Sequence, residues 1–208
     1  MTSKYNNVYI EDTYTIGGPY EADGPLAKYY DKLYKNDLYF NESSFEKAES
    51  KLMKDSVILL LKKTNKNKDD IDLLVAGDLQ NQIAASNYMA RDIDIPFLGI
   101  YNACATSSEG LIVASTFIDS KKIKSSICSV SSHNNASEKQ FRNPIEYGGP
   151  KPKTSTFTVT GAVSVLLSNK KSKVKIESST IGRVCDMGCQ RCKSYGSSDG
   201  YLGCRYYI

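Results

Sequence analysis

Cys104 is the residue of this chain that is best placed to do chemistry. It lies between an apolar segment, residues 96–101, and a run of small residues at 107–120, which predicts a buried strand, a turn and a helix in that order. A helix start presents unpaired N–H groups and the positive end of the helix dipole. A thiolate is favoured there, which makes the sulfur more nucleophilic. Spacing alone leaves a second interpretation open, in which Cys104 is a small apolar core residue.

A second group of cysteines lies near the end of the sequence. Cys185, Cys189 and Cys192 are spaced as C-x3-C-x2-C, which resembles the iron–sulfur motif of radical S-adenosylmethionine enzymes. That motif begins a large barrel, whereas only a short segment follows Cys192, and Arg191 occupies a position that is usually aromatic. A zinc site completed by Cys204 would have unusual spacing. We therefore expect no metal site and no cofactor. We expect free thiols, because no secretion signal is present.

Asp78 and His133 are two further polar residues that follow predicted strands. Asp78 comes after the apolar residues 71–76 and Gly77, and His133, the single histidine, comes after residues 124–131. Alternation of strands and helices predicts an α/β fold with a sheet layer. The expected strands are residues 71–76, 96–101, 124–131, 159–168 and 173–179, and the expected helices are 44–63, 82–91 and 107–120.

The segments around these elements are expected to be irregular. Residues 1–40 are rich in tyrosine and glycine turns, and residues 134–160 form a loop long enough to carry function. Ser43 and Glu46 match a capping box at the start of the first long helix. Residues 96–101 are expected to form a fully buried strand.

Composition excludes several classes of protein. The chain has 208 residues, of which 40% are hydrophobic and 24% charged, as in globular proteins. Its net charge of +4 is too weak to indicate nucleic-acid binding, and its lysine runs are not interleaved with aromatic residues. No apolar stretch is long enough to cross a membrane.

The residues around Cys104 also carry a family resemblance. The segment 103–107, Ala-Cys-Ala-Thr-Ser, resembles the nucleophile turn of the thiolase and ketoacyl synthase superfamily. Segments spread from about Gly24 to Gly188 resemble, in order, the stage V sporulation protein AD family. They lie at residues 76–82, 131–134, 138–142, 146–152, 158–161 and 181–184. The resemblance implies a thiolase-like α/β fold of two similar halves, with a mixed sheet and with buried and flanking helices. It also implies that this chain supplies the first half and that the second half is missing.

The family resemblance implies a function in spore formation. It implies a protein that binds dipicolinic acid and aids its uptake into the developing spore, together with other stage V sporulation membrane proteins. It places the protein in the cytoplasm, peripheral at the spore inner membrane. Asp78, Cys104 and His133 carry over as candidate ligand-pocket residues. The alternative is an acyltransferase with Cys104 as the acyl-accepting nucleophile, but the histidine that such enzymes use comes from the missing half.

Dipicolinate is a small planar dianion, so the pocket needs positive groups. A helix start lined by N–H groups and small hydroxyls suits a carboxylate, and Arg142 and Lys151 could add charge. Asp78 is awkward beside a dianion unless it orients a donor, binds through water or a cation, or is protonated. Calcium could bridge ligand and protein carboxylates.

No segment that resembles the family is identified after Gly188. We expect a thiolase-like N-terminal half at residues 1–188 and a tail outside the family at residues 189–208. Codons allowed for residues 188–208, shifted forward by one base, permit a string similar to the family's continuation. We therefore expect a frameshifted tail and a truncation that impairs function, which the downstream nucleotide sequence tests directly.

Overall fold

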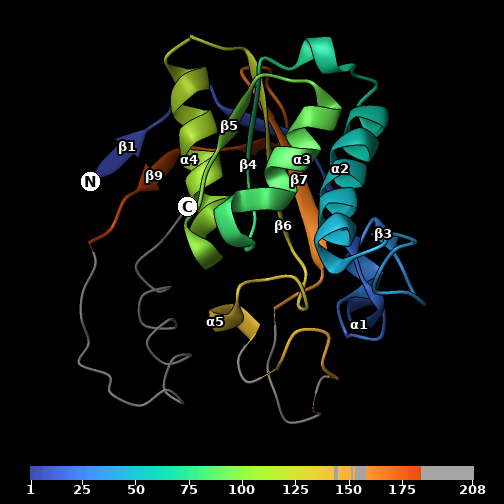
Figure 1. The fold of residues 1–208 in the computed structure, drawn as a ribbon. Coiled ribbons are helices and arrows are strands. Elements are labelled where there is room, and N and C mark those ends of the chain that lie inside the picture. The colour runs from blue at the N-terminus through green and yellow to red at the C-terminus, as the bar shows by residue number, and fades with distance from the viewer. Residues whose placement is uncertain (143–144, 151, 153–157, 184–208) are drawn as a thin grey trace.

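The fold is known from a computed structural model, which describes residues 1–142, 145–150, 152 and 158–183. The cysteine-rich tail, the boundary at residue 188 and Lys151 lie outside the described residues. Figure 1 shows a central sheet with helix α4 on one side and helices α2 and α3 on the other. The helices are α1 Pro19–Ala22, α2 Phe45–Lys63, α3 Ala84–Ile93, α4 Thr106–Asp119 and α5 Lys139–Arg142.

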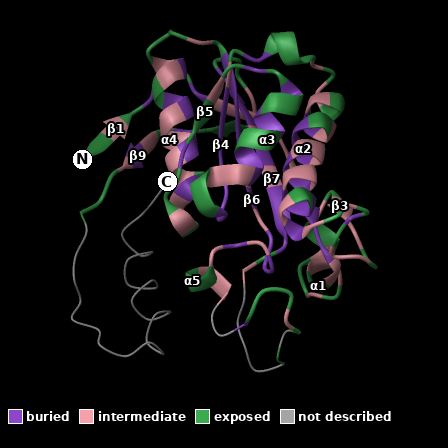
Figure 2. Ribbon diagram, in the orientation of Figure 1, coloured by how far each residue is buried: buried purple, intermediate pink, exposed green. Residues whose placement is uncertain are grey.

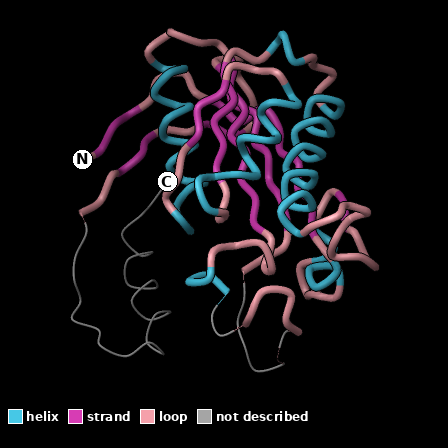
Figure 3. Tube along the Cα trace, viewed as in Figure 1, coloured by secondary structure: helices cyan, strands magenta, loops and turns pink. Residues whose placement is uncertain are grey.

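The main sheet is mixed, with strand order β3-β2-β7-β6-β4-β5, and β8 pairs with β2 beside this path. The strands are β1 Thr2–Lys4, β2 Tyr9–Gly17, β3 Lys32–Leu33, β4 Leu73–Gly77, β5 Phe97–Gly99, β6 Ser125–Ser132, β7 Gly161–Ser168, β8 Val174–Lys175 and β9 Ser178–Thr180. Strand β4 runs parallel to β5 and β6, and β7 runs antiparallel to β6 and β2. The parallel strands are joined through α3 and α4 (Figure 3), as parallel connections require.

Helix α2 carries the larger half of the core. The fully buried Leu52, Met53, Val57 and Leu60 recur at helical spacing and pack against the sheet with residues from α3. Figure 2 shows this buried stripe facing the buried strands. The cap differs from the expected one: Ser44, in extended conformation, accepts the Lys47 N–H at 3.3 Å. The capping box at Ser43 and Glu46 was therefore wrong by one residue.

Helix α4 covers the other face of the sheet through small residues. A Cβ atom added at Gly110 would lie 2.4 Å from Cys128 Sγ, so only glycine allows this approach of helix and strand β6. Ala114 and Ile118 are buried against Val75 and Cys128 in a second core cluster. Burial raises the pKa of the Cys128 thiol to about 12, which makes this cysteine an inert core residue.

Three expectations about strands need correction. Residues 1–40 contain the nine-residue strand β2, which pairs along its length with β7, because its aromatic and β-branched residues suit a half-buried strand despite its polar positions. Strand β5 is a short edge strand rather than a buried one, and Leu98 is 38% exposed. Residues 173–179 form two short strands, of which β8 pairs with β2 and β9 with β1.

No helix of the described residues is long and apolar enough to cross a membrane.

Candidate functional site

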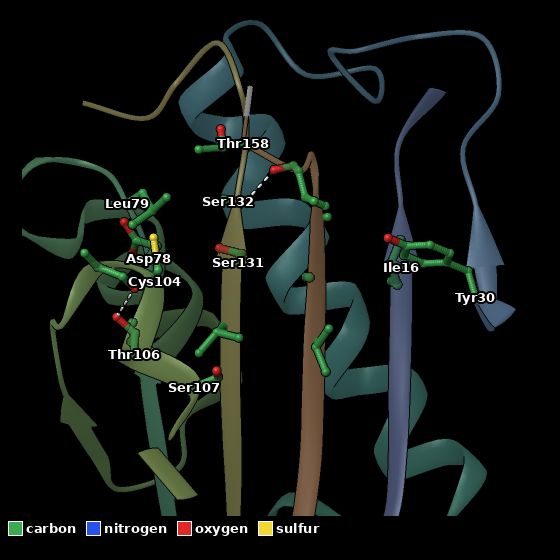
Figure 4. A pocket seen from close by; sticks show the side chains of 17 residues that line it. Ile16, Tyr30, Asp78, Leu79, Cys104, Thr106, Ser107, Ser131, Ser132 and Thr158 are labelled. Carbon is green, nitrogen blue, oxygen red and sulfur yellow. Dashed lines mark hydrogen bonds between the residues drawn. The ribbon is translucent and has the colours of Figure 1, made fainter. Parts of the chain in front are cut away.

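A pocket of about 440 Å³ lies where strands β4 and β6 end and helix α4 begins. Ligand sites of open α/β sheets occupy this position, outside the carboxyl ends of parallel strands. Figure 4 shows Asp78 and Cys104 close together on one side of the pocket, with Ser131 and Ser132 on the neighbouring strand. The lining residues are Ile16, Tyr30, Gly77, Asp78, Leu79, Ala103, Cys104, Thr106, Ser107, Val130, Ser131, Ser132, Thr158, Val159, Gly161, Ala162 and Val163.

Asp78 holds the turn that forms one wall of the pocket. Its Oδ1 accepts the Gln80 N–H at 2.8 Å, and its Oδ2 accepts both the N–H and the hydroxyl of Ser86, at 2.7 and 2.6 Å. The carboxylate therefore satisfies an N–H group in the first turn of α3. Burial raises the pKa of Asp78, while these hydrogen bonds act in the opposite direction.

The turns around the pocket are strained. Gln82, Ile83 and Ala103 have φ angles of 57°, 48° and 46°, which side chains with a Cβ atom rarely adopt. Gln82 and Ile83 lie between Gln80 and Ser86, and the hydrogen bonds of Asp78 to the backbone of both of these residues fix the two ends of this turn. Strain of this kind persists only where the surrounding structure enforces it, and it concentrates at functional sites.

Cys104 is exposed, and it lies in the 3₁₀ turn Ala103–Ala105 directly before α4. Thr106 locks this turn, since its hydroxyl donates to the Ala103 carbonyl at 2.8 Å and accepts the Asn102 N–H at 3.0 Å. The expected order of strand, turn and small-residue helix is confirmed. The alternative interpretation, in which Cys104 is a buried core residue, is wrong, because the side chain is exposed and lines the pocket.

His133 is fully buried behind the pocket and is absent from the lining residues. Its Nδ1 accepts the Asn135 N–H at 3.2 Å, so Nε2 carries the proton and donates to the Leu38 carbonyl at 2.9 Å. Burial lowers the pKa of His133, which keeps the ring neutral. Its ring centroid lies 5.2 Å from that of Phe45. The structure thus brings Asp78 and Cys104 together and places His133 outside that pair.

The charges expected from the long loop are not at the pocket in the described residues. Arg142 donates to the backbone carbonyls of Ser137 and Ile145, and among the described residues neither it nor any other arginine or lysine lines the pocket. Within the described part of the chain, no group of three or more potential ligands could hold a metal ion.

Glu49 is the residue that sequence reasoning missed. It lies on the buried face of α2. Its carboxyl group forms hydrogen bonds with Gln80 Nε2 at 2.8 Å and with Ser131 Oγ at 2.9 Å. The signal was present in the sequence, because Glu49 stands three and four positions before Leu52 and Met53, on the apolar stripe of the helix. A carboxyl group on such a stripe is rarely buried without partners.

Comparison with solved structures shows the fold. A variant of OleA from Xanthomonas campestris superposes with a TM-score of 0.54 over 80% of this chain and 59% of OleA, at 14% identity. The acyltransferase ChlB3 has a TM-score of 0.50 over 80% of this chain and 51% of its own, at 12% identity. The mixed sheet with helices on both faces is therefore a thiolase-like α/β fold, as expected from the sequence.

Comparison with sequences shows the family. The model of the family described as stage V sporulation protein AD matches residues 2–200. Stage V sporulation protein AD of Bacillus subtilis (strain 168) is 46% identical over 181 residues, which are 87% of this chain and 53% of that protein. The chain thus spans about half the length of this curated relative. It belongs to the stage V sporulation protein AD family, a family of sporulation proteins.

Proposed function

We propose that the pocket beside Cys104 binds dipicolinic acid, and that the protein aids the uptake of this compound into the developing spore. The observation that carries the proposal is the shared pocket of Asp78, Cys104 and the start of α4, in a chain of this sporulation family. The volume of about 440 Å³ lies within the range of small-ligand sites.

The lining chemistry suits a flat ring with carboxylates at its edge. Leu79, Val130, Val159 and Val163 offer apolar surface to the ring. Helix α4 has Ala105 as its N-cap, without a side-chain capping bond, and its first N–H group, that of Thr106, is bonded to the Ala103 carbonyl. The positive end of the helix dipole favours a carboxylate at this end of the helix. Among the described residues, the ligand charge is then met by the helix dipole rather than by arginine or lysine side chains.

Asp78 acts in this proposal as the support of one pocket wall. Both of its oxygens are already bonded within the turn, which favours this role over binding a calcium ion. His133 supports the site from behind, through Leu38 and Asn135. Calcium, if it enters with the ligand, would bind to the ligand's own carboxylates.

The proposed setting is the surface of the spore inner membrane. Partner membrane proteins of the same sporulation stage would receive or deliver the ligand, and this chain would contribute the pocket. Because the chain spans about half of the curated relative, binding by the chain is expected to be weaker than binding by the longer protein.

Calorimetric titration tests the proposal. Dipicolinate is titrated into the 208-residue chain, into the Bacillus subtilis relative and into two variants of the chain. Cys104→Phe fills the pocket, whereas Ser120→Phe places the same side chain at the exposed far end of α4. We expect saturable binding that Cys104→Phe weakens roughly tenfold or more and Ser120→Phe leaves unchanged. Absence of binding by the chain and the relative, or equal binding by both variants, would overturn the proposal.

The second candidate function is acyl transfer. It is favoured by the exposure of Cys104 before a helix and by the thiolase-like fold, to which the acyltransferase ChlB3 also belongs. In this reaction the Cys104 thiolate would attack an acyl-CoA thioester, form a Cys104 thioester and release coenzyme A. Mass spectrometry after incubation with an acyl-CoA distinguishes the two functions, because only acyl transfer adds an acyl mass to the Cys104 peptide.

A further inference from the structure

Glu49 is a fully buried carboxyl group between helix α2 and the two pocket walls. Its Oε2 accepts a hydrogen bond from Gln80 Nε2 at 2.8 Å, and its Oε1 is 2.9 Å from Ser131 Oγ. Gln80 Nε2 also lies 3.4 Å from the carbonyl oxygen of Glu46, so this end of the amide faces two acceptors and is the donor.

The partners of Glu49 connect it to two parts of the pocket wall. Ser131 lines the pocket from strand β6. The backbone of Gln80 donates to Asp78, which lines the pocket from the turn after β4. One carboxyl group therefore fastens the Asp78 turn to β6, and it does so from the α2 side of the sheet, away from Cys104.

The surroundings favour the neutral form of Glu49. The charged groups near it are Asp78 from the turn and Glu46 from its own helix, while Gln80 and Ser131 are uncharged. His133, which follows β6, is bonded to the Leu38 carbonyl instead. None of the ion pairs in the described part of the chain includes Glu49. Burial, reinforced by the charge of Asp78, raises the pKa of Glu49 to about 8.

The position of the proton on Glu49 decides what Ser131 can do. In the structure, Ser131 Oγ donates to Glu49 Oε1 at 2.9 Å. In the neutral acid Oε2 still accepts from Gln80, so the proton would sit on Oε1 and this bond would reverse, with Glu49 donating to Ser131 Oγ. The Ser131 hydroxyl hydrogen is then released and can turn toward an acceptor in the pocket. When Glu49 is ionised, Ser131 must instead donate to Oε1, and it offers an anionic ligand only lone pairs.

We propose that Glu49 is a positioning residue for the pocket, and that a dianionic ligand binds with Glu49 in its neutral form. As a neutral acid, Glu49 joins the two walls and frees the Ser131 hydroxyl to donate to a ligand carboxylate. Binding is thereby linked to the presence of one proton on Glu49. The identity of the ligand rests on the proposed function, whereas the link between Glu49 and the pocket walls does not.

The pH profile of dipicolinate affinity tests the linkage. The chain, Glu49→Gln and the matched control Glu46→Gln are titrated from about pH 6.5 to about pH 9.5, where dipicolinate stays a dianion. We expect the Kd of the unmodified chain to rise about tenfold per pH unit above the titration of Glu49. Glu49→Gln mimics the neutral acid, so it should keep the affinity measured at pH 7 and lose the rise of Kd with pH. Glu46→Gln should keep both, with the rise beginning at a slightly lower pH, because the charge of Glu46 contributes to the raised pKa of Glu49.

A second measurement makes the result independent of the ligand. Hydrogen exchange of the segment 78–86, corrected for intrinsic rates, should show protection that falls when Glu49 ionises in the unmodified chain and stays constant in Glu49→Gln. If the Kd of Glu49→Gln still rises with pH, or if its exchange protection still falls with pH, the inference is overturned. Loss of binding by folded Glu49→Gln at pH 7 would also overturn it. If no protein binds dipicolinate but the exchange profiles differ as expected, the proposed function fails and the role of Glu49 stands.

Discussion

A Gly77→Ala variant is expected to be destabilised by about 3 kcal/mol and to lose binding at the pocket. The added Cβ atom would lie 2.2 Å from the backbone oxygen of Ile100 and 2.6 Å from Thr106 Cγ2. The first contact is with backbone and cannot be relieved by a rotamer change. Strand β4 or the turn at Cys104 must therefore shift, and each of them forms a wall of the pocket.

Thermal unfolding followed by circular dichroism measures this effect. The control is Gly24→Ala, at which the nearest atom to an added Cβ is the Glu21 carbonyl oxygen at 3.3 Å. We expect a melting temperature several degrees lower for Gly77→Ala than for Gly24→Ala. Equal melting temperatures for the two variants would show that β4 and the Cys104 turn are not packed as closely as described.

The second large effect is a loss of stability as the pH rises. The pKa of Glu49 is raised from 4.5 to about 8 in the folded chain, so between these values the folded state holds a proton that the unfolded state has released. Folding then takes up a proton, and stability falls as the pH rises through this window. Below pH 4.5 the contribution is fully present, and by about pH 8 it is lost. Its size is on the order of 4 kcal/mol.

Urea unfolding at pH 5 and pH 9 measures this contribution by comparison with Glu49→Gln. The variant keeps every other titrating group, including His133, whose lowered pKa acts in the opposite direction. We expect the unmodified chain to lose stability relative to Glu49→Gln between the two pH values. A difference between the two proteins that does not change with pH would mean that Glu49 titrates near its ordinary pKa.

The sequence predicted the elements that follow simple patterns. The strand, turn and helix around Cys104 are visible as an apolar run followed by small residues, and strand β4 is visible as an apolar segment. Strand β6 was also predicted, although five of its eight residues are serine. Strand β2 was missed because its many polar residues gave no apolar segment in the sequence. It is stabilised as a strand by pairing with β7, which the sequence does not reveal. Strand β5 was expected to be buried because composition does not reveal that a strand lies at the edge of a sheet.

The sequence predicted two residues of the site, but it did not predict which residues are hydrogen-bonded to one another. Asp78 and Cys104 could be selected from the sequence, because both follow strands at which ligand sites occur. The link from Glu49 to Ser131 joins residues 82 positions apart, and it depends on how α2 lies across the sheet. The same limit applies to His133, which follows a strand as Asp78 does, yet turns away from the pocket toward Leu38.

Protection of Cys104 from alkylation is the measurement that tests the central claim most directly. Iodoacetamide should modify the exposed Cys104 in the native chain, whereas the buried Cys128 serves as an internal control that stays unmodified. If dipicolinate occupies the pocket, a concentration about ten times its Kd should slow alkylation of Cys104 about tenfold. An unchanged rate at a concentration at which calorimetry shows bound ligand would place dipicolinate elsewhere and contradict the account.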